Sequence, residues 1–332
     1  MASRPVSLNS ARLGRAPQEL RPAARPLRGL ATLLAACLLA LSPGSAEAAL
    51  RIVASTPDVA DMARQIGGDR VAVETIAQGS QDPHKVPMKP SFVTKLNRAD
   101  ALLVNGLGLE HAFLPGLLEV ANNPKILPTG EAYIDASIYV QPLEVPTSQN
   151  RSQGELHPLG NPHYNLDPVR GKLMAKAIAE GLARVDPAGA SAYAAGLARY
   201  TALLEQKIAE WNELAAPLRG VKVVSYHQDL VYLAERFGLE LVGTIETKPG
   251  VPATPGHLEE LVDTMKREQV KLVIREVAYE MPLAQTVAER TGARAVTIST
   301  LAGGLPGTES YVDSIEANLK ALVQAVQKGA SG

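Results

Sequence analysis

The chain has 332 residues, with 33 Lys and Arg against 34 Asp and Glu, and a formal net charge of −1. This balance argues against nucleic-acid binding, which requires a basic surface, and we expect no nucleic-acid partner. Hydrophobic residues make up 46% of the chain, and its one cysteine allows no disulfide within it. A chain of this length can bury a sizeable core without one.

The first 48 residues have the pattern of an export signal. Arginines occur up to Arg28, an apolar run follows at 29–41, and small residues lead to Ala46-x-Ala48. The run has 13 residues, fewer than the roughly 20 needed to cross a membrane. We expect cleavage after Ala48 and a periplasmic protein. Lipid attachment at Cys37, which follows Leu-Ala-Ala, is the alternative.

Alternating strands and helices follow the export signal. We expect strands at 50–55, 71–76 and 101–105, and helices at 57–66, 90–97 and 115–120. This alternation predicts a mostly parallel sheet with helices on both faces. Residues 141–162 interrupt the alternation, because they are polar and carry proline and glycine, which indicates a loop.

The middle of the chain is helical, and the rest returns to alternation. A helix at 169–184 precedes a longer one at 189–217, whose apolar residues recur every three or four positions. The longer helix would extend about 43 Å, enough to join two lobes. Later elements are strands at 221–225, 239–245, 272–275 and 295–298, and helices at 230–237, 255–269, 282–291 and 311–328.

The expected fold class is therefore α/β, with two lobes joined by one long backbone helix. Each lobe contains a mostly parallel sheet flanked by helices. We place the N-terminal lobe at 49–186, the linking helix at 187–218 and the C-terminal lobe at 219–332.

Three of the six histidines stand beside predicted strand ends or turns: His84, His163 and His227. Neutral imidazole is a common zinc ligand, and open α/β sheets place ligands beside the ends of their strands. Any one of these histidines could instead be a hydrogen-bonded surface or capping residue. The three together favour a single metal site with one further coordination position.

Several motifs around these histidines resemble the substrate-binding proteins of bacterial zinc and manganese ABC importers. The matching segments are Asp82-Pro-His84, Lys89-Pro-Ser91, 99–110, 161–168 and Tyr226-His227. The resemblance implies a metal bound between two lobes, with the three histidines as ligands. It also implies a membrane permease as partner and no enzymatic activity, and we expect a monomer.

The resemblance leaves the fourth ligand open. Many relatives carry an aspartate where this chain has Ser299, and a serine hydroxyl is a poor zinc ligand. Glu276 matches a carboxylate that faces the cleft in the family. It could bind the metal, act from outside the coordination shell or hold a water molecule, and an ion pair with Arg275 is the alternative. If neither Glu276 nor Asp229 reaches the metal, water completes the site.

The donor set favours Zn²⁺ as the transported ligand. Mn²⁺ prefers oxygen ligands, whereas zinc binds nitrogen readily. Manganese-binding members of the family tend to have glutamate in place of the third histidine. The expected function is capture of Zn²⁺ in the periplasm and its delivery to an ABC permease. A manganese importer component, an exported zinc hydrolase and a metal-binding adhesin are the alternatives.

The other three histidines are expected to lie outside the site. His157 shares the polar loop with Glu155, and we expect it to be solvated, with a transient contact to the ion as the alternative. His111 stands at the start of a helix and is expected to be structural. His257 lies in the first turn of a helix after Pro255, and we expect it to face solvent.

Overall fold

The computed structural model describes residues 48–146, 157–248 and 250–330. The predicted export signal at 1–48 lies outside these ranges except for its last residue, and so does part of the predicted loop at 141–162. Residues from Ala48 onward form one compact unit. Among its described residues, no helix is both long enough and apolar enough to cross a membrane.

The N-terminal lobe is built on a four-stranded parallel sheet in the order β2-β1-β3-β4. Its strands are β1 (Leu50–Ala54), β2 (Val71–Thr75), β3 (Ala101–Val104) and β4 (Tyr133–Asp135). Its helices are α2 (Pro57–Gly67), α3 (Pro90–Arg98) and α4 (Leu114–Ala121). All four residues of β3 are buried, as expected for a strand covered on both faces. The sequence did not predict β4, because its three residues are too few to show a periodic pattern.

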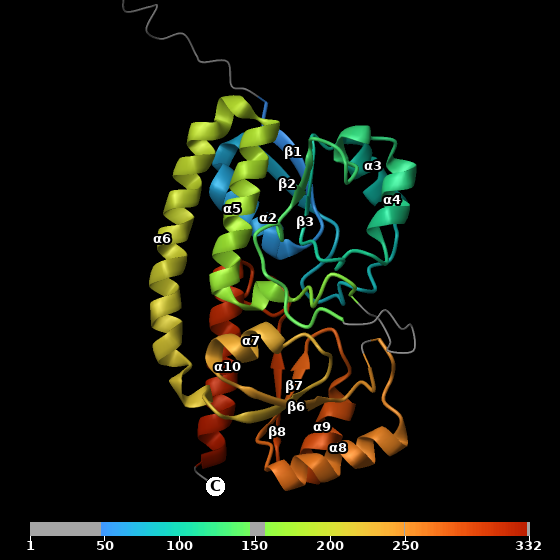
Figure 1. Ribbon diagram of the computed structural model, residues 1–332, viewed down its shortest axis with the longest axis vertical. Coiled ribbons are helices and arrows are strands. Elements are labelled where there is room, and N and C mark those ends of the chain that lie inside the picture. The colour runs from blue at the N-terminus through green and yellow to red at the C-terminus, as the bar shows by residue number, and fades with distance from the viewer. Residues whose placement is uncertain (1–47, 147–156, 249, 331–332) are drawn as a thin grey trace, which may run out of the picture. The chain divides into compact units, whose positions relative to one another are not determined.

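Two long helices follow, α5 (Pro168–Val185) and α6 (Ala190–Leu214). The 25 residues of α6 correspond to about 38 Å at 1.5 Å per residue. Figure 1 shows α6 passing alongside both sheets, as the sequence predicted. It packs closely on α2, because a Cβ atom at Gly196 would lie 2.0 Å from the carbonyl oxygen of Ile66. Glycine is therefore required at this crossing.

The C-terminal lobe repeats the same topology, with strands in the order β6-β5-β7-β8 and all pairs parallel. Its strands are β5 (Lys222–Ser225), β6 (Glu240–Thr244), β7 (Leu272–Glu276) and β8 (Arg294–Ile298). Its helices are α7 (Val231–Phe237), α8 (Pro255–Glu268), α9 (Met281–Thr291) and α10 (Tyr311–Ala330). The Thr254 hydroxyl caps α8 by accepting a hydrogen bond from the His257 amide.

Hydrogen bonds between buried groups join the two lobes. The Asp58 carboxylate accepts a hydrogen bond from the amide of Ala302, and the Asn165 side chain donates to the Thr300 carbonyl oxygen. Asp58 lies on α2, whereas Thr300 and Ala302 follow β8. The lobes also approach closely at glycines, because a Cβ atom at Gly79 would lie 2.2 Å from the Ala302 carbonyl oxygen. These contacts position the segments that carry the three histidines.

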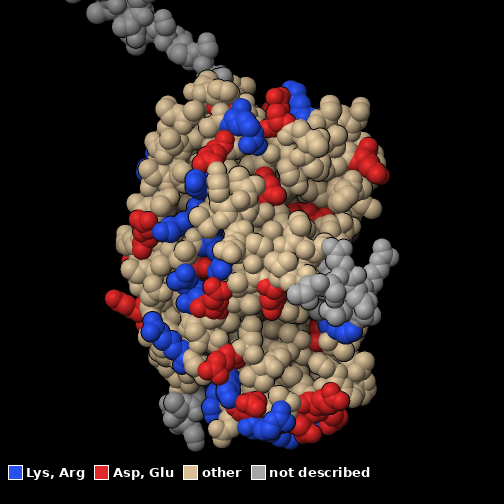
Figure 2. All heavy atoms as spheres, in the orientation of Figure 1, with Lys and Arg blue, Asp and Glu red and all other residues tan. Residues whose placement is uncertain are grey.

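Charged side chains of both signs are interspersed over the face shown in Figure 2, without a broad basic area on that face.

Candidate metal centre

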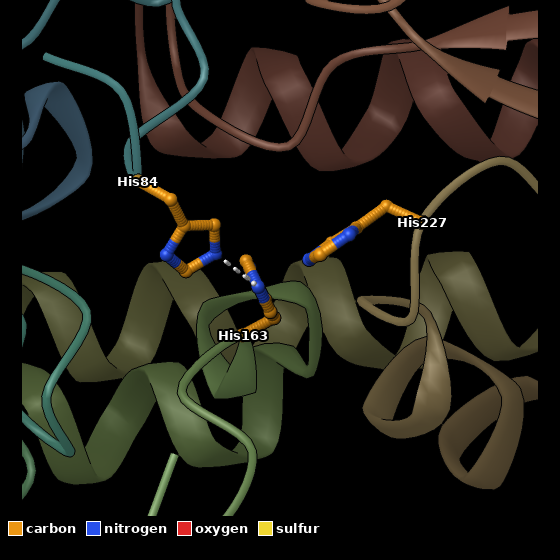
Figure 3. Close-up of side chains that lie close together, drawn as sticks. All are labelled: His84, His163 and His227. Atoms are coloured by element: carbon orange, nitrogen blue, oxygen red, sulfur yellow. Dashed lines mark hydrogen bonds between the residues drawn. The ribbon is translucent and has the colours of Figure 1, made fainter. Parts of the chain in front are cut away.

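The structure brings His84, His163 and His227 together from three separate segments. His84 lies between β2 and α3, His163 precedes α5, and His227 follows β5. One ring nitrogen from each lies within 4.8 Å of the others, and all three residues are buried. Figure 3 shows the three imidazole rings converging. The sequence prediction that these side chains share one place is therefore confirmed.

The closest pair of ring nitrogens matches the spacing expected at one metal ion. His84 Nε2 lies 3.1 Å from His163 Nε2 (Figure 3). Two nitrogens bound tetrahedrally to zinc at about 2.05 Å would lie about 3.3 Å apart. A metal ion could thus replace the proton that these two nitrogens share, with little movement of either ring.

Short side chains fix the backbone beside two of the histidines. The His84 amide donates to Asp82 Oδ1 at 2.9 Å, and the His163 amide donates to Asn161 Oδ1 at 3.0 Å. In both segments a proline stands between the two residues, and proline restricts the backbone of the residue before it. These Asx turns hold both imidazoles in place without a ligand.

His227 is oriented by a carboxylate. Its Nδ1 atom lies 2.6 Å from Glu246 Oε2, and both side chains are buried. The ring also stacks on Tyr279, with centroids 5.7 Å apart. A carboxylate on Nδ1 leaves Nε2 available to a metal and makes it a better donor. The sequence analysis missed Glu246, although the residue comes just after β6, at the sheet edge where ligands bind.

Burial keeps two of the three histidines neutral. Burial, together with the neighbouring histidines, lowers the pKa of His84 to about 2. Burial and the His84 ring also hold the pKa of His163 well below its usual value. For His227, burial lowers the pKa, but the hydrogen bond to Glu246 and the charge of Asp229 outweigh it, so the pKa is raised. Neutral rings at His84 and His163 have lone pairs ready for a metal.

Two buried carboxyl groups accompany His227 on the C-terminal side. Neither oxygen of Glu276 has a hydrogen-bond partner of good geometry among the described residues. Burial raises the pKa of this group to about 8, although Asp229 and the His227 backbone lie close enough to lower it in part. Burial and the Glu276 carboxylate raise the pKa of Asp229 well above its usual value. Buried acids without a cationic partner are costly, so this pair fits a site that receives a cation.

Glu276 does not belong to the group of mutually close donor atoms, which consists of the three histidines. The alternative of an ion pair with Arg275 is not realised. The Arg275 guanidinium donates instead to Thr297 Oγ1 and to the Tyr279 carbonyl oxygen. Ser299 also lies outside the donor group, because its buried hydroxyl donates to the Leu301 carbonyl oxygen at 2.6 Å.

The prediction that His157 is solvated is wrong. Its ring is half-buried with its centroid 4.9 Å from that of His84, and its Nε2 is buried without a hydrogen-bond partner among the described residues. Burial lowers the pKa of His157 to about 4. His157 therefore lies beside His84, which the polar sequence around it could not reveal.

The prediction that His257 faces solvent is also wrong, because this residue is half-buried and its Nε2 lies 2.9 Å from the Thr244 carbonyl oxygen. His111 is exposed, and its Nδ1 lies 3.0 Å from the Gly108 carbonyl oxygen. This local contact agrees with the structural role expected for His111.

Comparisons with known proteins agree with this architecture. The family model described as "Zinc-uptake complex component A periplasmic" matches residues 52–325. The manganese-binding lipoprotein MntA of Halalkalibacterium halodurans is 28% identical over 285 residues, which are 84% of this chain and 89% of that protein. The zinc-binding lipoprotein AdcA of Streptococcus pneumoniae is 24% identical over 304 residues, 90% of this chain and 60% of that protein. A crystal structure of ZnuA aligns with a TM-score of 0.70 at 26% identity, covering 84% of this chain and 99% of that one.

Proposed function

Because this chain belongs to the family of the periplasmic zinc-uptake component A, we propose that it captures Zn²⁺ in the periplasm and delivers it to the permease of an ABC importer. One observation carries this proposal. Three buried imidazoles converge with ring nitrogens within 4.8 Å of one another. At His84 and His163, burial disfavours the protonated imidazolium, so protons compete little with a metal ion for these two rings.

The donor types support zinc over manganese. All three donors in the close group are imidazole nitrogens, which suit zinc, whereas Mn²⁺ prefers oxygen ligands. The names of the relatives include both metals, since MntA is described as manganese-binding and AdcA as zinc-binding. The proposal of zinc therefore rests on the residues of this chain rather than on the names of its relatives.

We assign Glu276 to the coordination position that the three histidines leave open. Its carboxylate is buried and lacks hydrogen bonds among the described residues, so a bound cation would relieve its desolvation. Glu276 would bind the ion after a small shift or hold a water molecule that does. The ion is cargo in this proposal, and the protein performs no chemical reaction on it.

Release requires the donors to separate. His84 and His163 precede α6 in the chain, and His227 follows it. Because α6 runs alongside both lobes (Figure 1), we expect docking on the permease to move the lobes by small shifts rather than by wide opening. Separating His227 from the other two would break the three-donor set.

Metal content and competitive chelator titration test the proposal. The protein would be the chain from residue 49 onward, purified as wild type, His163→Ala, Glu276→Ala and the matched control His257→Ala. We expect one tightly bound zinc per chain, with Mn²⁺ bound more weakly. His163→Ala should lose this zinc and His257→Ala should keep it. A wild type without stoichiometric zinc, or equal binding by His163→Ala, would exclude the three-histidine site.

The same titration separates the roles of Glu276. A large loss of affinity in Glu276→Ala would support direct binding or a held water, and unchanged affinity would remove this residue from the site. Zinc-dependent hydrolysis of ester or amide substrates by the wild type would favour the exported zinc hydrolase instead.

A further inference from the structure

The N-terminal lobe contains a cavity that lies apart from the group of three histidines. It occupies about 710 Å³ between α4, the segment that follows it and the ends of β3 and β4. Sites for small organic molecules usually enclose roughly 300–1,000 Å³. The cavity is therefore far larger than a metal ion needs, and neither the fold nor the proposed metal transport accounts for it.

Leucines form most of the apolar wall of this cavity. They come from the turn after β3, from α4 and from the loops around it: Leu107, Leu114, Leu118, Leu127 and Leu159. The rim is apolar as well, because Leu159 is 60% exposed. An occupant with an apolar body would cover this side chain and remove it from water.

The charged side chains of the wall are all acidic. Glu110, Glu119 and Asp135 line the cavity, together with His111, and the described lining residues include no Lys or Arg. Glu119 is exposed at the surface of α4. Because the charged groups of the wall are all acidic, the cavity favours a positively charged ligand over an acidic one.

The wall is fixed in place before any occupant arrives. Glu110 Oε1 accepts hydrogen bonds from the Ser55 hydroxyl and the Asn105 amide at 2.6 and 2.7 Å. Asp135 Oδ1 accepts from both the amide and the hydroxyl of Ser137. Glu110 Oε2 also accepts from the Gly106 amide at 3.3 Å, so both oxygens of Glu110 are engaged. The second oxygen of Asp135 and the exposed Glu119 are therefore the carboxylate groups that would meet a ligand. A preformed wall lowers the entropic cost of binding.

We propose that this cavity binds a small apolar molecule that carries one primary ammonium group. The apolar body would pack against the leucines, and the ammonium group would face Asp135 and Glu119. This inference does not depend on the proposed metal transport. The cavity volume and the acid-only lining support a compact amine rather than a protein segment.

Three probes of similar size test the charge selection: 2-phenylethylamine, 2-phenylethanol and 3-phenylpropionate. Binding to the mature protein, both with added zinc and after chelation, would be measured by saturation-transfer NMR and calorimetry. We expect the amine to bind at least about tenfold more tightly than the alcohol, because an ammonium group donates a stronger hydrogen bond to a carboxylate than a neutral hydroxyl does. The acid should bind most weakly of the three.

Two variants locate the binding. Leu118→Trp places a larger side chain in the cavity and should abolish amine binding, whereas Leu203→Trp, at a 40% exposed position of α6, should not. Circular dichroism and zinc content would verify that Leu118→Trp folds. Glu119→Lys changes an exposed residue, so it tests the charge even if Leu118→Trp fails to fold, and it should weaken amine binding severalfold.

Three outcomes would overturn the proposal: no binding of the amine, equal binding of the acid, or full binding by both Leu118→Trp and Glu119→Lys. Binding of a basic peptide without binding of the free amine would also overturn it, because that result would identify a protein-docking surface. Loss of zinc binding in the wild type would not affect these outcomes, so the two proposals fail independently.

Discussion

The two sides of the metal centre are built differently. On the N-terminal side, His84 and His163 are neutral, and amide hydrogen bonds to Asp82 and Asn161 fix their backbones. On the C-terminal side, His227 contacts a buried carboxylate and has a raised pKa. One side therefore presents neutral donors in fixed positions, and the other holds the carboxyl groups that can ionise to balance the charge of a cation.

This difference suggests how one site could bind tightly and still release. A cation bound between the lobes would be coordinated by His84 and His163 of the first side. Its charge would be balanced by Glu246, Asp229 and Glu276 of the second side. A shift between the lobes would weaken coordination and charge compensation together. Small shifts would then have large effects, because the interaction between charges depends steeply on distance at low dielectric.

The largest expected effect comes from removing a neutral donor. His84→Ala leaves two imidazoles and a void at the centre, and we expect zinc affinity to fall by more than the roughly 10–100-fold typical of losing an outer-shell partner. Competitive chelator titration would measure the change. His111→Ala, which alters an exposed histidine nearby, is the matched control and should change affinity little. If His84→Ala and His111→Ala lost zinc affinity to a similar extent, membership of the close group of three histidines would not identify the ligands.

Removing the carboxylate that orients His227 should have the next largest effect. Glu246→Gln keeps the size of the side chain but removes its charge, and zinc affinity should fall about 10–100-fold. Asp82→Asn is its counterpart on the other side. It keeps an oxygen that can accept from the His84 amide, so the loss should be smaller than in Glu246→Gln. Equal losses in these two variants would contradict the division of the site into a neutral and a charged side.

The sequence predicted the fold well because each long element carries its own periodic pattern. Helix α6 shows buried residues at Tyr193, Gly196, Tyr200 and Leu204, which is the spacing of one helix face. Strand β4 was missed, because three residues contain less than two repeats of a strand pattern. Helix α5 begins after Asp167, whose side chain accepts from the Val169 amide, and aspartate before a proline is a common helix start. Such local signals can be read without knowledge of the fold.

The candidate site was predictable only in part, because its parts come from different segments. Three histidines were found by residue type and by position beside strand ends. Glu246 was missed because a glutamate between a strand and a proline-containing loop looks like any surface acid, and only the fold places it 2.6 Å from His227. The burial of His157 was misjudged for the same reason, because polar neighbours in the sequence do not reveal what a histidine side chain packs against.

Glu276→Gln should have an intermediate effect that separates charge from coordination. Glu276 can ionise when zinc binds and the amide cannot, so zinc affinity should fall about tenfold, which is about 1.4 kcal/mol, if Glu276 acts mainly through its charge. A loss as large as that of His84→Ala would instead identify Glu276 as a ligand. Titration of both variants under the same conditions distinguishes the two results, and unchanged affinity would remove the carboxylate from either role.

The smallest effect concerns the stability of the zinc-free protein against pH. Burial raises the pKa of Glu276 to about 8 and that of Asp58 to about 7. The folded state therefore holds protons that the unfolded state has released, and stability is lost as pH rises through these values. His84 and His163 do not oppose this trend above neutral pH, because their pKa values are lowered and they are neutral in both states there. The free energy of unfolding should thus fall between about pH 7 and about pH 8 and level off at higher pH, measured by denaturant unfolding after chelation. Glu276→Gln should flatten this decline and Asp82→Asn should not. A stability that rises over this range would show that the buried acids are ionised in the folded protein, so the carboxylates would carry their full charge before the metal arrives.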